Sequence, residues 1–204
     1  MNDDAVTIDA LKHVASISAG HPIRGSVDAL QPGDTGVIQL RDVSADHEIG
    51  WSGIKRVLLP KSREIGILGT EDVLFAGRGM RCYALAVGEA PFPAVAAPHF
   101  FVIKIQDTNV ISPKFLAWQL NQRPAQDYFQ RVSAGTAQRS IRRSSLEELE
   151  IQIPSLYKQN MICELWATAQ AEQRRLRRLE KVRNKQLEAI AFDLLNQNEG
   201  THHE

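Results

Sequence analysis

The residues best suited to chemistry in this chain are arginines and lysines that stand in turn-rich segments. The densest group lies at 135–143, where three arginines accompany a glycine, a threonine and a glutamine. Arginine forms paired hydrogen bonds with phosphates and with base edges, and glycine lets a backbone approach a ligand closely. The segment is therefore a candidate nucleic-acid contact, made by Gly135, Thr136, Gln138, Arg139, Arg142 and Arg143.

Two smaller basic groups have the same character. In the first group, Arg78 and Arg81 flank a glycine turn that follows an apolar run. The second group lies on both sides of another apolar run and consists of Lys55, Arg56, Lys61 and Arg63. The alternative for every group is a solvated charge or a structural ion pair. The chain is formally neutral, yet residues 1–50 carry an excess of five negative charges and residues 51–143 an excess of seven positive charges. The middle of the chain can thus present a basic face.

Catalytic patterns are missing from the sequence. We find no glycine-rich phosphate loop, no zinc-ligand spacing, no nucleophile elbow and no methyltransferase cofactor loop. The histidines are isolated apart from a terminal pair, and Cys82 and Cys163 match no metal spacing. We expect no metal site, no cofactor in this chain, free thiols and a non-catalytic role.

The elements that must position these residues are strand-rich over the first 150 residues. Alternating or short apolar runs bounded by Gly and Pro predict strands at 36–43, 55–60, 65–69, 72–79, 82–87, 99–105 and 150–154. A helix is predicted over 112–130, with Ser112 as its N-cap and Pro113 in its first position. Because Pro124 interrupts the pattern, two helices that meet near Arg123 are equally compatible.

A change of composition follows Pro154. Residues 155–197 contain neither Gly nor Pro and are rich in strong helix formers, which predicts one helix of about 60 Å at 1.5 Å per residue. Its own small domain cannot cover so long an apolar stripe, so another helix of the same kind or a partner protein must pack there; the alternative is a helix folded back on its domain. The stripe consists of Ile162, Leu165, Trp166, Ala169, Leu176, Leu179, Val182, Leu187, Ile190 and Leu194.

These features follow one another in an order that is similar to that of a known protein family. A strand with a glycine turn (EDVLFAGRG), a helix (SPKFLAWQLNQ), a basic loop (SAGTAQRSIRRSSLEEL) and a junction (IQIPSLYKQ) precede the long helix. Together they resemble the target-recognition domain and conserved helix of type I restriction–modification specificity subunits. The junction from Pro154 to Gln159 is the most specific part. The resemblance runs from about Leu11 to Leu195 and is closest from Glu71 onward.

The resemblance implies an α+β fold: a mixed, strand-rich target-recognition domain (1–154), a long helix (155–197) in an antiparallel coiled coil with a partner helix, and a disordered tail (198–204). Such subunits carry two domains and two helices, so this chain resembles a half-subunit. Expected partners are double-stranded DNA, a second copy bound through the helix, a DNA methyltransferase subunit that uses S-adenosylmethionine, and a restriction or translocase subunit. Target site and half-site spacing would be set by this chain.

Two alternatives stay open. The chain could be a stand-alone DNA-binding module of another phage-defence or regulatory system, or a coiled-coil interaction protein that never touches DNA. An acidic start and the lack of an apolar run of eighteen residues predict a cytoplasmic protein without membrane association.

Overall fold

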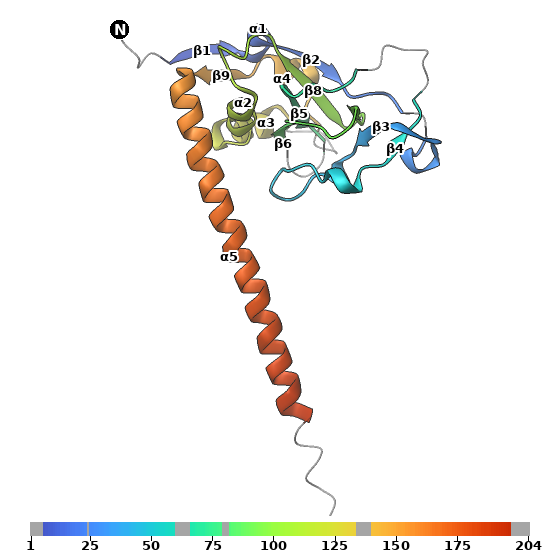
Figure 1. Cartoon of the computed structure of the whole chain (residues 1–204). Coiled ribbons are helices and arrows are strands. Elements are labelled where there is room, and N and C mark those ends of the chain that lie inside the picture. Colours follow the sequence, from blue (N-terminus) through green and yellow to red (C-terminus); the bar gives the residue numbers. More distant parts are fainter. Residues whose placement is uncertain (1–5, 24, 60–65, 79–81, 134–139, 197–204) are drawn as a thin grey trace, which may run out of the picture. The chain divides into compact units, whose positions relative to one another are not determined.

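A computed structural model describes residues 6–23, 25–59, 66–78, 82–133 and 140–196 (Figure 1). The chain divides into two compact units, Met1–Cys163, here called the globular unit, and Glu164–Glu204. All strands of the described chain lie in the globular unit, and the described part of the second unit is helical throughout. The predicted fold class, a strand-rich α+β domain followed by a long helix, is confirmed. The partner helix stays a prediction.

An antiparallel sheet forms the centre of the globular unit. Its strand order is β2 (Ala15–Ala19), β8 (Phe100–Ile105), β5 (Asp72–Ala76) and β6 (Tyr83–Ala86). All five residues of β5 are buried. Side chains of a strand alternate between the two faces of a sheet, so complete burial means that both faces are covered.

Different layers cover these two faces. Val73 and Phe75 of β5 belong to a core cluster with residues of α2 (Pro113–Leu120) and α3 (Arg123–Val132). Leu74 and Ala76 belong to a second cluster with residues of β3 (Pro32–Ile38) and β7 (Ala94–Ala96). In that smaller sheet β3 runs parallel to β7 and antiparallel to β4 (Arg56–Val57).

A third, two-stranded sheet joins segments from the two ends of the globular unit. β1 (Thr7–Ala10) pairs antiparallel with β9 (Glu150–Ile153), and Asp9 lies opposite Ile151. The short α1 (Leu11–Val14) follows β1, and its buried Leu11 donates its main-chain N–H to the carbonyl of Leu149 over 2.9 Å.

Carboxamide side chains from one helical segment hold two strand edges. The Gln119 amide accepts from the Gln152 N–H (3.0 Å) and donates to its carbonyl (2.9 Å) on β9. The Asn121 amide does the same for Ala84 of β6, at 2.9 Å and 2.8 Å. These side chains satisfy main-chain groups at strand edges that would otherwise seek another strand.

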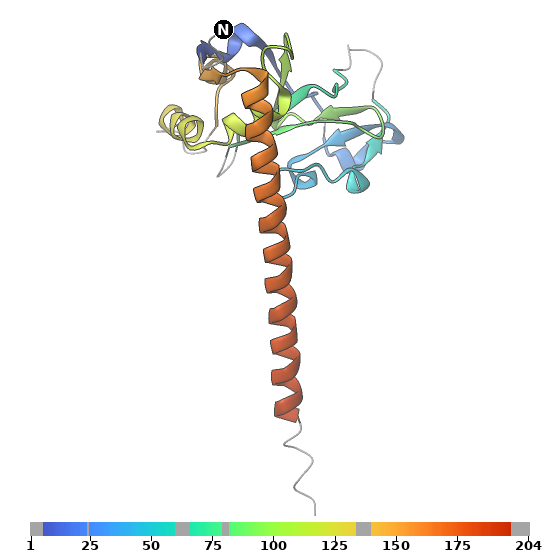
Figure 2. The ribbon, with the colours of Figure 1, turned by 60° about the vertical axis from the view of Figure 1, so that its left-hand side comes forward.

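The long helix α5 (Leu156–Asn196) has 41 residues and runs without a break (Figure 2). Gln159 in its first turns is fully buried. Its amide accepts from the Ser112 N–H (2.9 Å) and donates to the carbonyls of Val110 (2.8 Å) and Pro154 (2.9 Å). These bonds tie the start of α5 into the globular unit, which extends to Cys163, beyond the predicted domain end at 154.

Of the two predictions for 112–130, the two-helix alternative is confirmed: α2 and α3 meet near Arg123, and α2 is capped by the Ser112 hydroxyl accepting from the Phe115 N–H (3.2 Å). Other local predictions differ from the structure, since the strand predicted at 36–43 ends at Ile38. The strand predicted at 65–69 is wrong for 66–69, which form no strand although Leu68 is buried. The strands β1, β2 and β7 were not predicted, since each is short and depends on a partner distant in sequence.

Candidate nucleic-acid interface

The predicted nucleic-acid contact residues fall partly outside the described chain. Five of them, Lys55, Arg56, Arg78, Arg142 and Arg143, have described positions. The rest lie outside the described residues: Lys61, Arg63, Arg81, Gly135, Thr136, Gln138 and Arg139. The predicted tail at 198–204 also lies outside them.

The structure brings two of the predicted groups together in one place. Arg78 and Ser140 form an isolated antiparallel bridge, and the Ile141 N–H donates to the carbonyl of Gly77 over 2.8 Å. Ile141 is buried in the core, which anchors the bridge. A Cβ on Gly77 would lie 3.4 Å from Ile141 and closer still to Phe75, so the approach favours glycine. We call Arg78 with Ser140–Arg143 the basic bridge.

The two last arginines of the basic bridge begin α4 (Arg143–Glu147). Arg142 is the exposed N-cap residue of that helix. Arg143 donates through Nε to the Glu147 carboxylate at 2.7 Å, one helical turn away. Exposed pairs of this kind are weak and can open towards another anion. Arg142 is therefore the stronger candidate for a phosphate contact.

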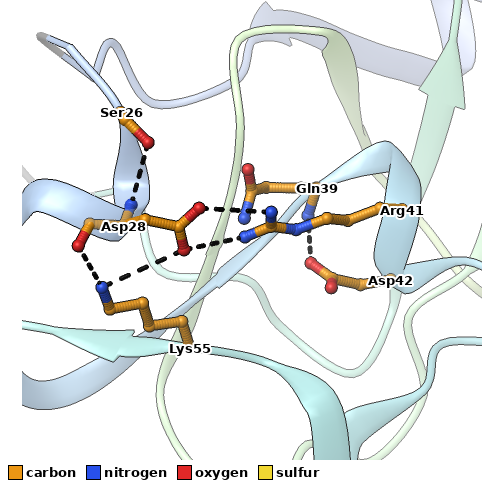
Figure 3. Close-up of polar contacts among 6 residues, drawn as sticks. All are labelled: Ser26, Asp28, Gln39, Arg41, Asp42 and Lys55. Atoms are coloured by element: carbon orange, nitrogen blue, oxygen red, sulfur yellow. Dashed lines mark hydrogen bonds and ion pairs between the residues drawn. The ribbon is translucent and has the colours of Figure 1, made fainter.

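A second basic cluster surrounds Asp28, next to β3 and β4 (Figure 3). The Arg41 guanidinium donates to both carboxylate oxygens of Asp28, at 3.1 Å and 3.3 Å. Lys55 Nζ donates to the main-chain carbonyl of Asp28 at 2.6 Å and lies 4.0 Å from its carboxylate. Arg56 stacks over the Phe92 ring, 5.5 Å from its centroid. We call Arg41, Lys55 and Arg56 the Asp28 cluster.

Electrostatics keep this cluster charged. The hydrogen bond from Arg41 lowers the pKa of Asp28, and the same bond raises the pKa of Arg41. Asp28 therefore stays ionised at neutral pH, and its favourable contribution to folding is lost only as acid titrates it through that lowered value. Arg41 and Lys55 share the Asp28 carboxylate, and the Asp42 carboxylate also acts on Arg41. Arg56, which lies over the Phe92 ring, is the third cation of the cluster. Arg41 was not among the predicted residues, because no other Lys or Arg lies near it in the acidic first fifty residues.

Replacing Asp28 with asparagine is expected to increase the basic character of this cluster, since Arg41 and Lys55 lose their shared anion. If the cluster contacts phosphate, the log–log dependence of DNA affinity on salt should steepen by up to about 0.9 for each cation released to a phosphate. Titration of a fluorescent duplex at several salt concentrations measures the slope. Glu164→Gln removes the same charge from α5 and serves as the control. Equal slopes for Asp28→Asn and the control would place this cluster outside the interface.

His47 is another residue to which the sequence assigned no role, and its backbone conformation is uncommon. His47 has a positive φ of 60°. Its ring stacks on Tyr83 of β6 with centroids 4.8 Å apart. Burial lowers the pKa of His47, so the ring is neutral at pH 7. The stack holds the loop that carries His47 against the central sheet, an arrangement invisible in the local sequence.

The predicted stripe on α5 is exposed over most of its length. Exposure ranges from 44% at Trp166 to 68% at Leu165 among the large apolar side chains of the stripe, and Ala169 is exposed as well. Ile162 is the exception: it is half-buried and packs against the core of the globular unit. Phe192 and Leu195, which were not assigned to the stripe, are also exposed.

No group of three or more His, Cys, Asp or Glu that could hold a metal ion occurs among the described residues. Within the same residues, no helix is long and apolar enough to cross a membrane. Cys82 and Cys163 form no disulfide in the described chain, and burial raises the pKa of Cys163.

Three solved structures with a similar architecture come from type I restriction–modification systems. The type I restriction–modification S subunit from M. genitalium is 17% identical with a TM-score of 0.58, over 98% of this chain and 48% of that one. A structure described as the basis of complex assembly and conformational transition of the type I system is 15% identical with a TM-score of 0.64. The match covers 94% of this chain and 45% of that one. The HsdS subunit from Thermoanaerobacter tengcongensis is 16% identical with a TM-score of 0.52, and the match covers 82% of this chain and 38% of that one. The fold is thus that of type I S subunits.

The family follows from the sequence itself. The model described as Type I restriction modification DNA specificity domain matches residues 54–188. The chain belongs to this family. It spans about half the length, or less, of the S subunits to which its fold is similar. No curated protein matches the chain at a significant level.

Proposed function

We propose that this chain recognises a DNA sequence as the specificity component of a type I restriction–modification system. The observation that carries the proposal is the family match over residues 54–188, which includes the basic bridge, Lys55 and Arg56 of the Asp28 cluster, and most of α5. Phosphate contacts would position the protein, and base contacts from neighbouring turns would specify sequence. The chemistry would belong to partner subunits, a methyltransferase that uses S-adenosylmethionine and a restriction or translocase subunit.

The long helix is proposed as the docking element of this assembly. Its exposed stripe supports binding of a second copy or of a partner subunit, since a monomer rarely leaves an apolar surface of this extent in water. Two recognition domains held by paired helices would read two half-sites at a fixed spacing. Location in the cytoplasm, where such partners would act, is part of the same proposal.

Selection from a random duplex library tests the recognition function. The full chain, alone and with a co-expressed methyltransferase subunit, should enrich one bipartite motif over background. Enrichment of no motif under either condition, together with affinity independent of duplex sequence, would contradict specific recognition. Failure to bind duplex at low salt would favour an interaction protein that works through α5.

The double substitution Arg142→Ala and Arg143→Ala is expected to weaken DNA binding and to flatten its salt dependence. Each lost phosphate contact reduces the log–log slope by about 0.9, so two lost contacts reduce it by about 1.8. Because Arg143 already pairs with Glu147, most of the change should come from Arg142.

Arg123→Ala with Arg131→Ala is the matched control, because it removes two arginines from α3 instead. Binding isotherms from 50 to 300 mM salt, roughly the range over which such contacts are sensitive, give both slopes. An unchanged slope after loss of Arg142 and Arg143 would remove the basic bridge from the interface.

A further inference from the structure

A block of basic residues lies within α5. Seven of the twelve residues from 174 to 185 are arginine or lysine, and Glu180 is the only acid among them. The rest of α5 contains one basic residue, Lys158, and four acidic ones, so the excess of positive charge is confined to this block. Like charges that are four residues apart destabilise a helix. The block therefore does not serve helix formation, and binding of an anion gives it a role.

Four of these basic side chains share one side of the helix. An α-helix turns by about 100° per residue, so steps of four, three and four residues keep side chains within an arc of about 60°. Arg174, Arg178, Lys181 and Lys185 follow those steps, and we call them the cationic face. Arg178, Lys181 and Lys185 are exposed, and Arg174 is partly buried. At about 1.5 Å per residue, the cationic face is about 16 Å long.

The cationic face and the apolar stripe lie on opposite sides of α5. The same helical geometry places Leu165, Leu176 and Leu187 about half a turn around the helix from the centre of the cationic face. A helix or protein that covers the apolar stripe therefore leaves the cationic face accessible. One helix can thus bind two different partners, of which the second is anionic.

The acidic residues of α5 leave the middle of the cationic face uncompensated. Oppositely charged side chains pair along a helix at separations of three or four residues. Glu180 has such a separation from Arg177 and Arg183, which lie outside the cationic face, and from none of its members. Arg178 and Lys181 have no acidic residue three or four positions away. Their charges are therefore available to an external anion.

We propose that the cationic face binds the phosphate backbone of the duplex DNA between two half-sites. The inference rests on the proposed function, in which α5 sets the distance between two half-sites, so that the intervening duplex spans the same distance. One strand of B-DNA presents a phosphate about every 3.4 Å along its axis, and about five phosphates match the length of the cationic face. Contacts with phosphate carry no sequence information, so the face positions the intervening duplex without reading it.

The composition of the cationic face favours DNA over an acidic protein surface. Lysine is depleted at interfaces between proteins, whereas arginine and lysine supply many of the contacts with DNA phosphates. Protein-binding helices also place apolar side chains among their charges. Two of the four members of the cationic face are lysines, and none of the four is apolar.

Neutralising the two central cations of the full chain tests the proposal. Arg178→Gln with Lys181→Gln removes two charges and retains good helix formers. We expect DNA affinity to fall by about tenfold or more near about 0.1 M salt, and the log–log salt slope to flatten by about 1.8. The loss should be equal for a fluorescent duplex that carries the enriched motif and for one of mixed sequence, because both have the same phosphates.

Arg175→Gln with Arg183→Gln is the matched control. Both arginines belong to the basic block but lie about a quarter turn or more around the helix from the cationic face. This pair should leave the salt slope unchanged, and sedimentation checks that both double variants keep the assembly state of the parent. Equal flattening by the two pairs would overturn the proposal. An unchanged slope for Arg178→Gln with Lys181→Gln, together with loss of a co-purifying methyltransferase, would assign the face to an acidic protein instead.

Uncharged phosphates locate the contact on the DNA. Methylphosphonates placed between the two half-sites should weaken binding by the parent chain and have little effect on Arg178→Gln with Lys181→Gln, which has already lost the contact. The same groups placed outside the half-sites should affect both chains equally. Equal weakening of both chains by the inner methylphosphonates would overturn the proposal. Motif enrichment with an unchanged salt slope would refute the cationic face alone, and a flattened slope on mixed-sequence duplex without any enriched motif would refute the recognition function alone.

Discussion

Gln159→Leu is expected to destabilise the globular unit by about 3–5 kcal/mol, because it removes three hydrogen bonds at once and orphaned buried groups cost about 1–3 kcal/mol each. The Ser112 N–H and the carbonyls of Val110 and Pro154 would lose their partner, and leucine can replace none of these contacts. Burial of the leucine side chain offsets part of the loss. The Gln159 side chain itself is fully buried.

Urea unfolding of the full chain measures this loss, with Gln126→Leu as the matched control. Gln126 is half-buried and its amide donates one hydrogen bond, to the Leu120 carbonyl at 2.7 Å. The control should cost about 1 kcal/mol. A Gln159→Leu protein as stable as the control would show that water or a local shift replaces the three bonds.

Gln159 lies in the first turns of α5, the helix that we propose as the docking element. Its bonds hold the first turns of α5 against the segment Val110–Ser112, so the helix starts from a fixed place on the globular unit. If paired helices set the distance between two half-sites, weaker attachment of the first turns of α5 should make that distance more variable. We expect Gln159→Leu to accept more than one spacer length in motif selection, at temperatures where it remains folded.

Gly20→Ala is expected to destabilise the globular unit by about 3 kcal/mol or more, at the upper end of overpacking costs, because its methyl group would meet rigid backbone. A Cβ at Gly20 would lie 2.1 Å from the Ala97 carbonyl oxygen and 2.7 Å from that of Ala96. Gly20 directly follows β2, and Ala96 ends β7, so the close approach joins the central sheet to the smaller one. The Gly20 N–H also donates to the Phe100 carbonyl at 2.9 Å.

Gly53→Ala is the control, since a Cβ there meets nothing within 4 Å and its φ is negative. Its effect should stay within about 0.5 kcal/mol. Thermal unfolding should separate the variants clearly, as each kcal/mol lowers Tm by about 2–4 °C in a chain of this size. Similar melting temperatures for the two variants would show that the backbone at Ala96 and Ala97 can move aside.

The sequence alone predicted the elements whose signals are local. The long helix was predicted because residues 155–197 lack Gly and Pro and are rich in strong helix formers, and most steps of its stripe are three or four residues. The buried strands β5 and β8 and the capped start of α2 were predicted for similar reasons. The family resemblance, carried by the order of these local signals, is confirmed by the match over 54–188.

Only the tertiary structure decided which basic residues lie together. Arg78 meets Ser140 through a bridge across more than sixty residues of chain, and Arg41 meets Lys55 only because both bind Asp28. The pattern of residues within one segment cannot predict such contacts between distant segments. They depend on strand pairing and on the burial of residues such as Ile141, whose partners are distant in sequence. Local propensity depends on neighbouring residues in the sequence. A binding surface depends on the packing of segments that are distant in sequence, so no single segment predicts it.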